Sequence, residues 1–284
     1  MQQEGASLKA FIVDAFATRA FAGNPAAVCL VETDLCEEVM LSVAQEFNLS
    51  ETAFIGSTDI PSRYSIRCFS PKQEIPLCGH ATLGSARVIF AISSLTAATF
   101  VTGEGVEINV CAVGDQLEMI LPSYATDSAE APAALLSALG IGSVVNTEYN
   151  PQTRILLLEI KSVSELSALR PDFGALRRSH DSINGVLVTA RCSSGEHDFH
   201  SRYFWPWSGG DEDPVTGGIH TFLAGYWAQR LGKDRMRSYQ SSRRGGSMEV
   251  ELCTQGVKLR TSAVIVFEGT MRSSVLESAR ELGR

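Results

Sequence analysis

A two-part motif occurs twice in this chain, once in each half. The first copy spans residues 67–79 (RCFSPKQEIPLCG) and the second spans residues 202–217 (RYFWPWSGGDEDPVTG). The second copy is longer because three additional residues lie between its two parts, where a surface loop tolerates insertion. The copies start 135 residues apart in a chain of 284, which is too long a period for a solenoid. The duplication therefore predicts two homologous halves related by a pseudo-twofold axis, with a cleft between equivalent loops.

The length of the chain also favours two domains. At 284 residues it exceeds a typical single domain. Residues 122–132 are polar, small and bounded by prolines, which is typical of a linker. We therefore expect an N-terminal lobe of residues 1–121, a linker of residues 122–132 and a C-terminal lobe of residues 133–284. The last strand either stays in the C-terminal lobe or returns to the N-terminal one.

A helical pattern follows each copy of the motif. Apolar and small residues recur at helical spacing in residues 81–92, after Gly79, and in residues 219–227, after Gly217. We expect these segments to be the central helices of the two lobes. Each helix would be wrapped by mostly antiparallel strands, with its N-terminus open to the cleft.

Composition and charge argue against nucleic-acid and membrane partners. The formal net charge is −8, and the basic runs are no longer than the pairs Arg177–Arg178 and Arg243–Arg244, whereas a phosphate-binding protein clusters its basic residues. The first residues lack the apolar segment of a secretory signal. No apolar run approaches the ~18 residues that suggest a membrane-spanning helix. We expect a soluble, cytoplasmic protein.

The cysteines and the short motifs indicate neither a metal nor a cofactor. The seven cysteines include no C-x-x-C pair, so we expect reduced thiols rather than a disulfide framework or a zinc site. No phosphate-binding glycine motif occurs, so a nucleotide cofactor has no support. Cys78 has Thr216 as its counterpart in the second copy. A racemase that uses two thiols is therefore disfavoured, because a threonine hydroxyl is too weak a base to replace a thiolate.

The glycine of each copy precedes a predicted helix and suggests an anion site. Unpaired N–H groups and the helix dipole favour a negative group at such a terminus. We expect Gly79 and Gly217 to face a small carboxylic acid. The alternative is that both glycines only form tight turns.

Four carboxylates are candidates for proton transfer or for structural roles. Asp213 occupies the position that Ile75 has in the first copy, and this asymmetry suggests function. Glu74 and Glu212 occur in both copies, so we expect a scaffold role in which they bond backbone groups of the turn. Glu51 lies between a predicted helix and a strand. Spacing alone favours an exposed Glu51, but inside a closed cleft it could give and take protons.

Five blocks of this sequence together resemble the PhzF family of phenazine biosynthesis-like proteins, which has the fold of diaminopimelate epimerase. The resemblance runs nearly end to end and keeps the family's order. The blocks are residues 13–16 with 21–28, 46–54, 77–83, 212–217 and 240–246.

The resemblance implies an α+β fold with two pseudo-symmetric lobes, each a mostly antiparallel β-barrel wrapped around a central helix. It also implies an active site without a cofactor, a small-molecule carboxylate as substrate and a homodimer. Glu51 would shuttle the proton, as in the family's isomerase of a dihydroxy-cyclohexadiene carboxylate, with His80 and Asp213 as helper residues. The expected substrate-binding residues lie at the two helix starts: Cys78, Gly79, Thr216, Gly217 and Gly218.

The sequence departs from the family at Gly218, where a serine is usual, so one substrate-binding hydroxyl is absent there. We expect a cofactor-independent isomerase that moves a proton on a small carboxylic acid by general acid/base catalysis. Two alternatives stay open. One is an amino-acid epimerase or racemase that uses Cys78 with another base. The other is a catalytically silent small-molecule-binding or regulatory protein.

Overall fold

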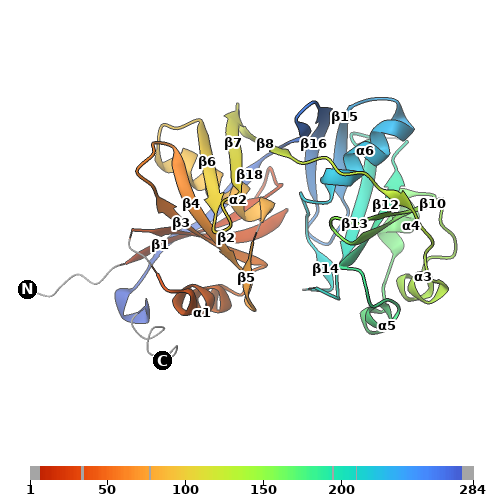
Figure 1. Cartoon of the computed structure of the whole chain (residues 1–284), viewed down its shortest axis with the longest axis horizontal. Helices are drawn as coiled ribbons and strands as arrows, with labels where there is room; N and C mark the ends of the chain where they lie inside the picture. The colour runs from red at the N-terminus through yellow and green to blue at the C-terminus, as the bar shows by residue number, and fades with distance from the viewer. Residues whose placement is uncertain (1–6, 33–34, 77, 194, 209, 277–284) are drawn as a thin grey trace, which may run out of the picture. The chain divides into compact units, whose positions relative to one another are not determined.

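The computed structural model describes residues 7–32, 35–76, 78–193, 195–208 and 210–276, and it divides the chain into two compact units. Unit 1 contains the described residues up to Ile120 together with those from Arg260 onward. Unit 2 contains Leu121–Leu259. Each unit combines a sheet with helices, as the labels of Figure 1 show.

Unit 1 is a mixed sheet built around a buried helix. Strand β1 pairs antiparallel with both β18 and β2, and β2 continues parallel to β3. β3 then pairs antiparallel with β4, which is parallel to β6, and β6 and β7 are antiparallel. The elements are β1 (Leu8–Ala15), β2 (Asn24–Val31), α1 (Glu37–Phe47), β3 (Glu51–Ser57), β4 (Arg63–Phe69), β5 (Glu74–Ile75), α2 (Gly79–Ile92), β6 (Ala97–Thr102), β7 (Glu107–Val113), β8 (Gln116–Leu121) and β18 (Ala263–Met271).

Helix α2 is the central helix of unit 1. It contacts strands β1, β2, β3, β6, β7 and β18. Its N-terminal half is buried, and small residues there let the strands approach closely. A Cβ added at Gly84 would lie 3.4 Å from Cβ of Val13. The helix expected at residues 81–92 is confirmed.

Unit 2 combines strands with four helices among its described residues. β10 pairs antiparallel with β9 and β11, and β11 continues parallel to β12. β12 pairs antiparallel with β13, which is parallel to β15, and β15 and β16 are antiparallel. The elements are β9 (Asp127–Ser128), α3 (Ala133–Leu139), β10 (Asn146–Asn150), β11 (Ile155–Glu159), α4 (Val163–Ala168), α5 (Phe173–Arg178), β12 (Gly185–Arg191), β13 (Phe199–Phe204), β14 (Glu212–Asp213), α6 (His220–Leu231), β15 (Arg235–Gln240), β16 (Gly246–Cys253) and β17 (Gly256–Thr261).

Helix α6 is the central helix of unit 2 and packs on the sheet through aromatic residues. The ring of Trp227 stacks on Phe199 of β13 with centroids 5.4 Å apart. Its indole N–H donates to Oγ1 of Thr189 on β12 at 3.0 Å. A separate core holds α3, α4 and α5 to strands β11 and β12 through buried Leu135, Leu166 and other apolar residues.

The duplication of the sequence is visible in the pairing of the strands. From β2 to β7 the successive pairs are parallel, antiparallel, parallel and antiparallel, and the series from β11 to β16 is the same. The two-residue strands β5 and β14 pair with equivalent partners, β4 and β13. The predicted α+β fold with two pseudo-symmetric lobes is confirmed.

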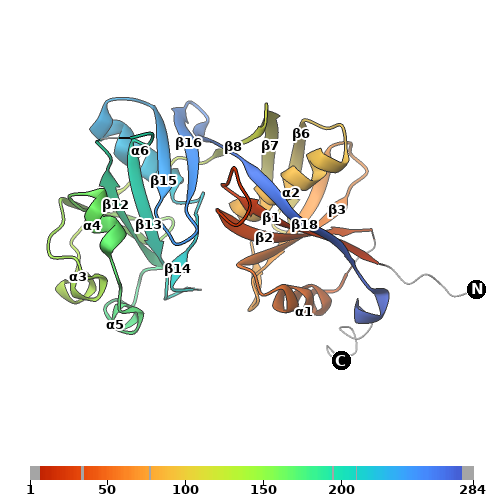
Figure 2. The same ribbon diagram turned by 180° about the vertical axis from the view of Figure 1, so that it is seen from behind.

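Two segments near the expected domain boundaries contain strands that pair with other strands of the units. Residues 122–132, predicted as a linker, include β9, which pairs with β10 through Ser128 and Asp127. Strand β18 runs antiparallel to β1 from Ala263 to Met271, so it lies in unit 1. Figure 2 shows β18 beside β1.

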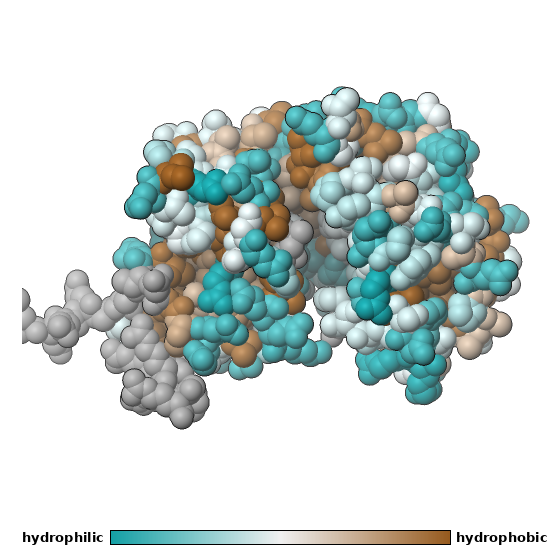
Figure 3. Space-filling view, in the orientation of Figure 1, coloured by the Kyte–Doolittle hydropathy of each residue, from teal (hydrophilic) through white to brown (hydrophobic). Residues whose placement is uncertain are grey.

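The surface carries a mixture of residue types. In the view of Figure 3, hydrophilic and hydrophobic residues are interspersed over both units. Within the described part of the chain, no helix has the length and apolar character needed to cross a membrane.

Candidate functional site

Glu51 is the first residue of β3 and is buried, with 7% of its surface exposed. Helix α1 ends at Asn48, whose left-handed backbone reverses the chain. Ser50 Oγ then contacts Asn24 Oδ1 at 3.4 Å, and Glu51 pairs with Ala26 of β2. The start of β3 is therefore held inside the sheet. The interpretation of Glu51 as an exposed carboxylate is wrong, because this non-local pairing buries it.

His80 and Cys78 lie at the start of α2 and complete a buried row of groups with Glu51. Nε2 of His80 is 2.9 Å from Oε2 of Glu51. On the other side of the ring, Nδ1 of His80 is 3.3 Å from Sγ of Cys78. All three residues are less than 9% exposed. The structure thus brings together three of the residues predicted for the site.

The carboxylate and the imidazole keep hydrogen-bonding capacity for a third group. Oε2 of Glu51 and Nε2 of His80 form an ion pair at 2.9 Å, and neither has a further hydrogen-bond partner among the described residues. Buried polar atoms are almost always satisfied in folded proteins, and exceptions suggest a functional role. These two atoms are therefore placed to bind or to protonate a ligand.

The electrostatics of the row favour a neutral thiol and a protonated ring. A hydrogen bond with Cys68 and burial raise the pKa of Cys78 well above its usual value. Burial alone would lower the pKa of His80, but Cys78 and Glu51 outweigh it and hold the pKa well above its usual value.

The start of α2 also offers backbone donors. The N-cap residue Cys78 forms no side-chain cap, and the first N–H bonded within the helix is that of Thr82, to Cys78 O at 3.1 Å. The preceding N–H groups, including that of Gly79, have no partner within the helix. A Cβ added at Gly79 would meet no atom within 4 Å, and its φ is not positive. Neither crowding nor a positive φ requires a glycine at this position, where α2 begins.

In unit 2 the structure brings Asp213 and Thr216 together. Asp213 is 8% exposed, and Thr216 Oγ1 donates to Asp213 Oδ2. Gln240 fixes this turn, because its Oε1 accepts from Thr216 N at 2.9 Å and its Nε2 donates to Asp213 O at 2.8 Å. Sequence reasoning gave Gln240 no role. It lies 24 residues from Thr216, and no local pattern links the two.

The start of α6 differs from the expectation that Gly217 leads directly into a helix. α6 begins at His220, after a turn in which His220 N bonds Gly217 O and Thr221 N bonds Gly218 O. Gly217 and Gly218 lack positive φ values, and Gly218 faces open space. Gly217 and Gly218 thus belong to a turn, although no positive φ requires a glycine at either position.

His220 is buried but does not resemble His80. Its Nε2 is 2.8 Å from Ser238 Oγ and its Nδ1 is 3.2 Å from Gly217 O. Burial lowers the pKa of His220 to about 4. A neutral ring with both nitrogens in contact is a structural group rather than an acid or base for a ligand.

Glu74 and Glu212 have arginine partners instead of the backbone partners that we expected. Arg67 donates to both oxygens of Glu74, at 2.8 and 2.6 Å. Arg202 donates to both oxygens of Glu212, at 2.7 and 2.8 Å. The arginine and the glutamate both belong to the duplicated motif, so each copy carries its own bidentate ion pair. The scaffold role was predicted, but the bonding was not, because strand pairing decides which side chains meet.

The group of Glu51, Cys78 and His80 is also one that could hold a metal ion, since its ligand atoms lie within 4.8 Å of one another. However, Cys78 faces Nδ1 of His80 and Glu51 faces Nε2. These nitrogens point in different directions, so an ion bound at one of them faces away from the partner of the other. The arrangement suits a row of proton donors and acceptors better than a three-ligand metal site.

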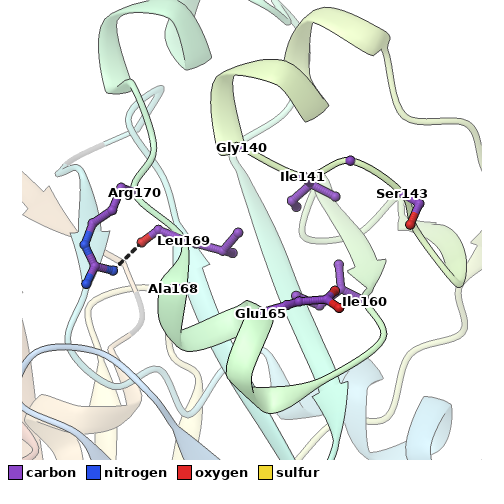
Figure 4. Close-up of a pocket in the computed structure, with 9 residues that line it drawn as sticks. Gly140, Ile141, Ser143, Ile160, Glu165, Ala168, Leu169 and Arg170 are labelled. Atoms are coloured by element: carbon purple, nitrogen blue, oxygen red, sulfur yellow. Dashed lines mark hydrogen bonds between the residues drawn. The ribbon is translucent and has the colours of Figure 1, made fainter.

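One cavity lies beside Cys78, and another lies apart from the predicted site residues. A cavity of about 410 Å³ in unit 1 is lined by Cys68, Cys78, Arg67 and neighbouring residues, but not by Glu51 or His80. A cavity of about 500 Å³ in unit 2 lies beside α4 and the loop after α3. Figure 4 shows its labelled residues, including Glu165 and Arg170. None of the predicted site residues lines this second cavity.

The sequence and the duplicated α+β fold of this chain have counterparts in known proteins. The family model described as phenazine biosynthesis-like protein, PhzC-PhzF, matches residues 13–269. The phenazine biosynthesis-like domain-containing protein of Homo sapiens is 41% identical over 285 residues, which cover 93% of this chain and 99% of that protein. An uncharacterized isomerase of Pseudomonas aeruginosa is 41% identical over 270 residues, covering 93% of this chain and 98% of that protein.

A solved structure of the same class supports the fold. The PhzF-family phenazine biosynthesis protein of Enterococcus faecalis superposes with a TM-score of 0.87 at 35% identity, covering 94% of this chain and 99% of that one. The chain belongs to the PhzC-PhzF family of phenazine biosynthesis-like proteins.

Proposed function

We propose that this protein is a cofactor-independent isomerase that moves a proton on a small carboxylic acid. The observation that carries the proposal is the buried pair of Glu51 and His80, whose facing atoms lie 2.9 Å apart and have no further hydrogen-bond partner among the described residues. A relative at 41% identity is named an isomerase, which agrees with this class of reaction.

In the proposed reaction Glu51 acts as both base and acid. Its carboxylate takes a proton from one carbon of the substrate, and the electrons of that C–H bond form a new double bond. The electron pair of the double bond that the substrate had at the start takes the proton back from Glu51, and a C–H bond forms at another carbon. Atoms and electrons balance without an oxidant or a reductant, and His80 keeps its positive charge beside the reacting groups.

The backbone N–H groups at the start of α2 are proposed to bind the substrate carboxylate. A helix N-terminus stabilises an anion by about 0.3–1 kcal/mol at the surface, and by more when it is partly buried. Asp213, held by Thr216 and Gln240, is proposed as a further acid of the reaction, and Gly217 and Gly218 as further backbone donors.

The test is incorporation of solvent deuterium into a panel of cyclic and amino acids. We expect one class of acid to exchange, and we expect Glu51→Gln to slow that exchange by about 10²–10⁴-fold. Glu38→Gln is the matched control, because Glu38 is an exposed glutamate on α1. Unchanged exchange in Glu51→Gln would refute the assignment. Ligand binding without exchange in the wild type would instead indicate a binding protein.

A further inference from the structure

Cys78 contacts His80 on the side of the ring that faces away from Glu51. Its Sγ is 3.3 Å from Nδ1, while Nε2 is 2.9 Å from Oε2 of Glu51. Cys78 is the N-cap residue of α2, and His80 is the second residue of that helix. The same helix start therefore fixes both side chains, and the thiol and the carboxylate hold opposite sides of one ring.

The thiol is poorly placed to be the base of a racemase. The cavity that it lines includes neither Glu51 nor His80, so a ligand at the Glu51–His80 pair is not in that cavity. The high pKa of Cys78, caused by its hydrogen bond with Cys68 and by burial, keeps the thiol protonated. A protonated thiol cannot remove a proton from carbon.

We propose that Cys78 is a positioning residue that holds the ring of His80 with Nε2 turned toward Glu51. This inference rests on the proposed function, in which the Glu51–His80 pair carries the chemistry. A protonated imidazole donates from both nitrogens, so Nδ1–H points to Sγ of Cys78 and Nε2–H toward Glu51. Without a partner at Nδ1, the ring is free to turn and to place a carbon opposite the carboxylate. Partners on the remote nitrogen of a functional histidine orient the ring in many sites.

The first test is spectroscopic and needs no substrate. The protein is labelled with ¹⁵N-histidine, and the signals of His80 are assigned by their loss in His80→Gln. In the wild type we expect a single ordered ring that titrates above the usual pH range of histidine. In Cys78→Ala we expect the pKa of His80 to fall, because burial remains while one stabilising partner is lost, and the ring signals to broaden. Cys78→Ser keeps a hydrogen-bonding group, so it should restore much of the wild-type spectrum.

Cys29→Ala is the control for loss of a buried thiol, because Cys29 is buried in the core with α1 and leaves Cys78 and its neighbours unchanged. Its His80 signals should stay close to those of the wild type. An unchanged His80 spectrum in Cys78→Ala would overturn the proposal.

The second test separates the positioning role from a role as base. Alkylation by iodoacetamide, followed by mass spectrometry, should be slow at Cys78 and faster at the exposed Cys36 of the same molecule. If the deuterium assay finds an exchanging acid, Cys78→Ala should lower its exchange by about 10-fold or more, and Cys78→Ser should lower it less. Complete loss in Cys78→Ser with an unchanged His80 spectrum would make the thiol the base and overturn the proposal. If the spectra change as expected but no acid exchanges, the proposed function fails while the role of Cys78 in holding the ring stands.

Discussion

At the scale of single residues, His80 and His220 show how neighbours decide the charge of a buried histidine. Both lie at the start of a central helix and both are buried, with 8% of the surface of His80 and 0% of that of His220 exposed. His80 has a carboxylate within 2.9 Å and its pKa is raised, whereas His220 has a hydroxyl and a carbonyl and its pKa is lowered to about 4. Burial acts in the same direction on both rings, so the adjacent groups account for the difference.

The lowered pKa of His220 predicts a loss of stability in acid. Between its usual value of 6.5 and about 4, the unfolded chain binds a proton that the folded chain does not bind. The free energy of unfolding therefore falls as the pH falls through this range. Between pH 7 and pH 5 we expect the wild type to lose about 2 kcal/mol more than His220→Gln loses. Urea unfolding at both pH values measures this difference, and parallel pH dependence of the two proteins would contradict it.

At the scale of elements, the two copies of the motif use the same ion pair in different surroundings. The side chains of Arg202 and Glu212 are 10% and 19% exposed, against 32% for both Arg67 and Glu74. Arg202 also donates to the carbonyl groups of Leu166 and Leu169 around the end of α4, at 3.2 and 2.9 Å. The pair in unit 2 thus joins β13 and β14 to a helix, and its loss leaves a more deeply buried charge unpaired.

We predict that Arg202→Met destabilises the protein by about 3–5 kcal/mol, because Glu212 and two carbonyl groups lose their donor. The matched variant Arg67→Met should cost only about 1 kcal/mol, since its pair is partly exposed and screened by water. Chemical denaturation of the two variants gives the free energies of unfolding. Equal losses of stability would show that the additional partners of Arg202 do not contribute to the free energy of unfolding.

Sequence patterns predicted the long elements but not the short ones. Periodicity identified the central helices because each presents a continuous apolar face to a sheet. The turn from Gly217 to Ile219 could not be told from a helix start, since its bonds are set by local backbone geometry. The two-residue strands β5 and β14 are too short to show alternation, and they exist through their pairing with β4 and β13.

The candidate site was predictable only in part. The family resemblance indicated Glu51 and His80, and the structure brings the two side chains to 2.9 Å. The burial of Glu51 depends on the pairing of β2 with β3, which spacing does not reveal. The clamp by Gln240 likewise joins residues far apart in the chain.

At the scale of the whole molecule, the two units differ in how the chain builds them. Unit 2 is one continuous stretch, Leu121–Leu259, whereas unit 1 needs residues from both sides of it. β18 covers one side of β1 along that strand, from Leu8 to Ala15. Leu276 joins the core formed by Leu8, Val39 and other residues.

We predict that a fragment of residues 121–259 folds alone and that a fragment of residues 1–120 does not. The second fragment lacks the partner of β1 and part of its core, so it keeps an exposed strand edge. Near-ultraviolet circular dichroism and amide hydrogen exchange distinguish the two outcomes. Adding a peptide of residues 260–276 should restore protection in the 1–120 fragment. A fully protected 1–120 fragment without the peptide would contradict the prediction.

The return of β18 to β1 also sets an order for folding during translation. The nascent chain presents β1 at the ribosome long before its neighbour on one side has been made, and unit 2 is complete in the meantime. The sheet that carries Glu51 therefore closes only after unit 2 has been made. Until then the edge of β1 that β18 covers is open to pairing with other chains.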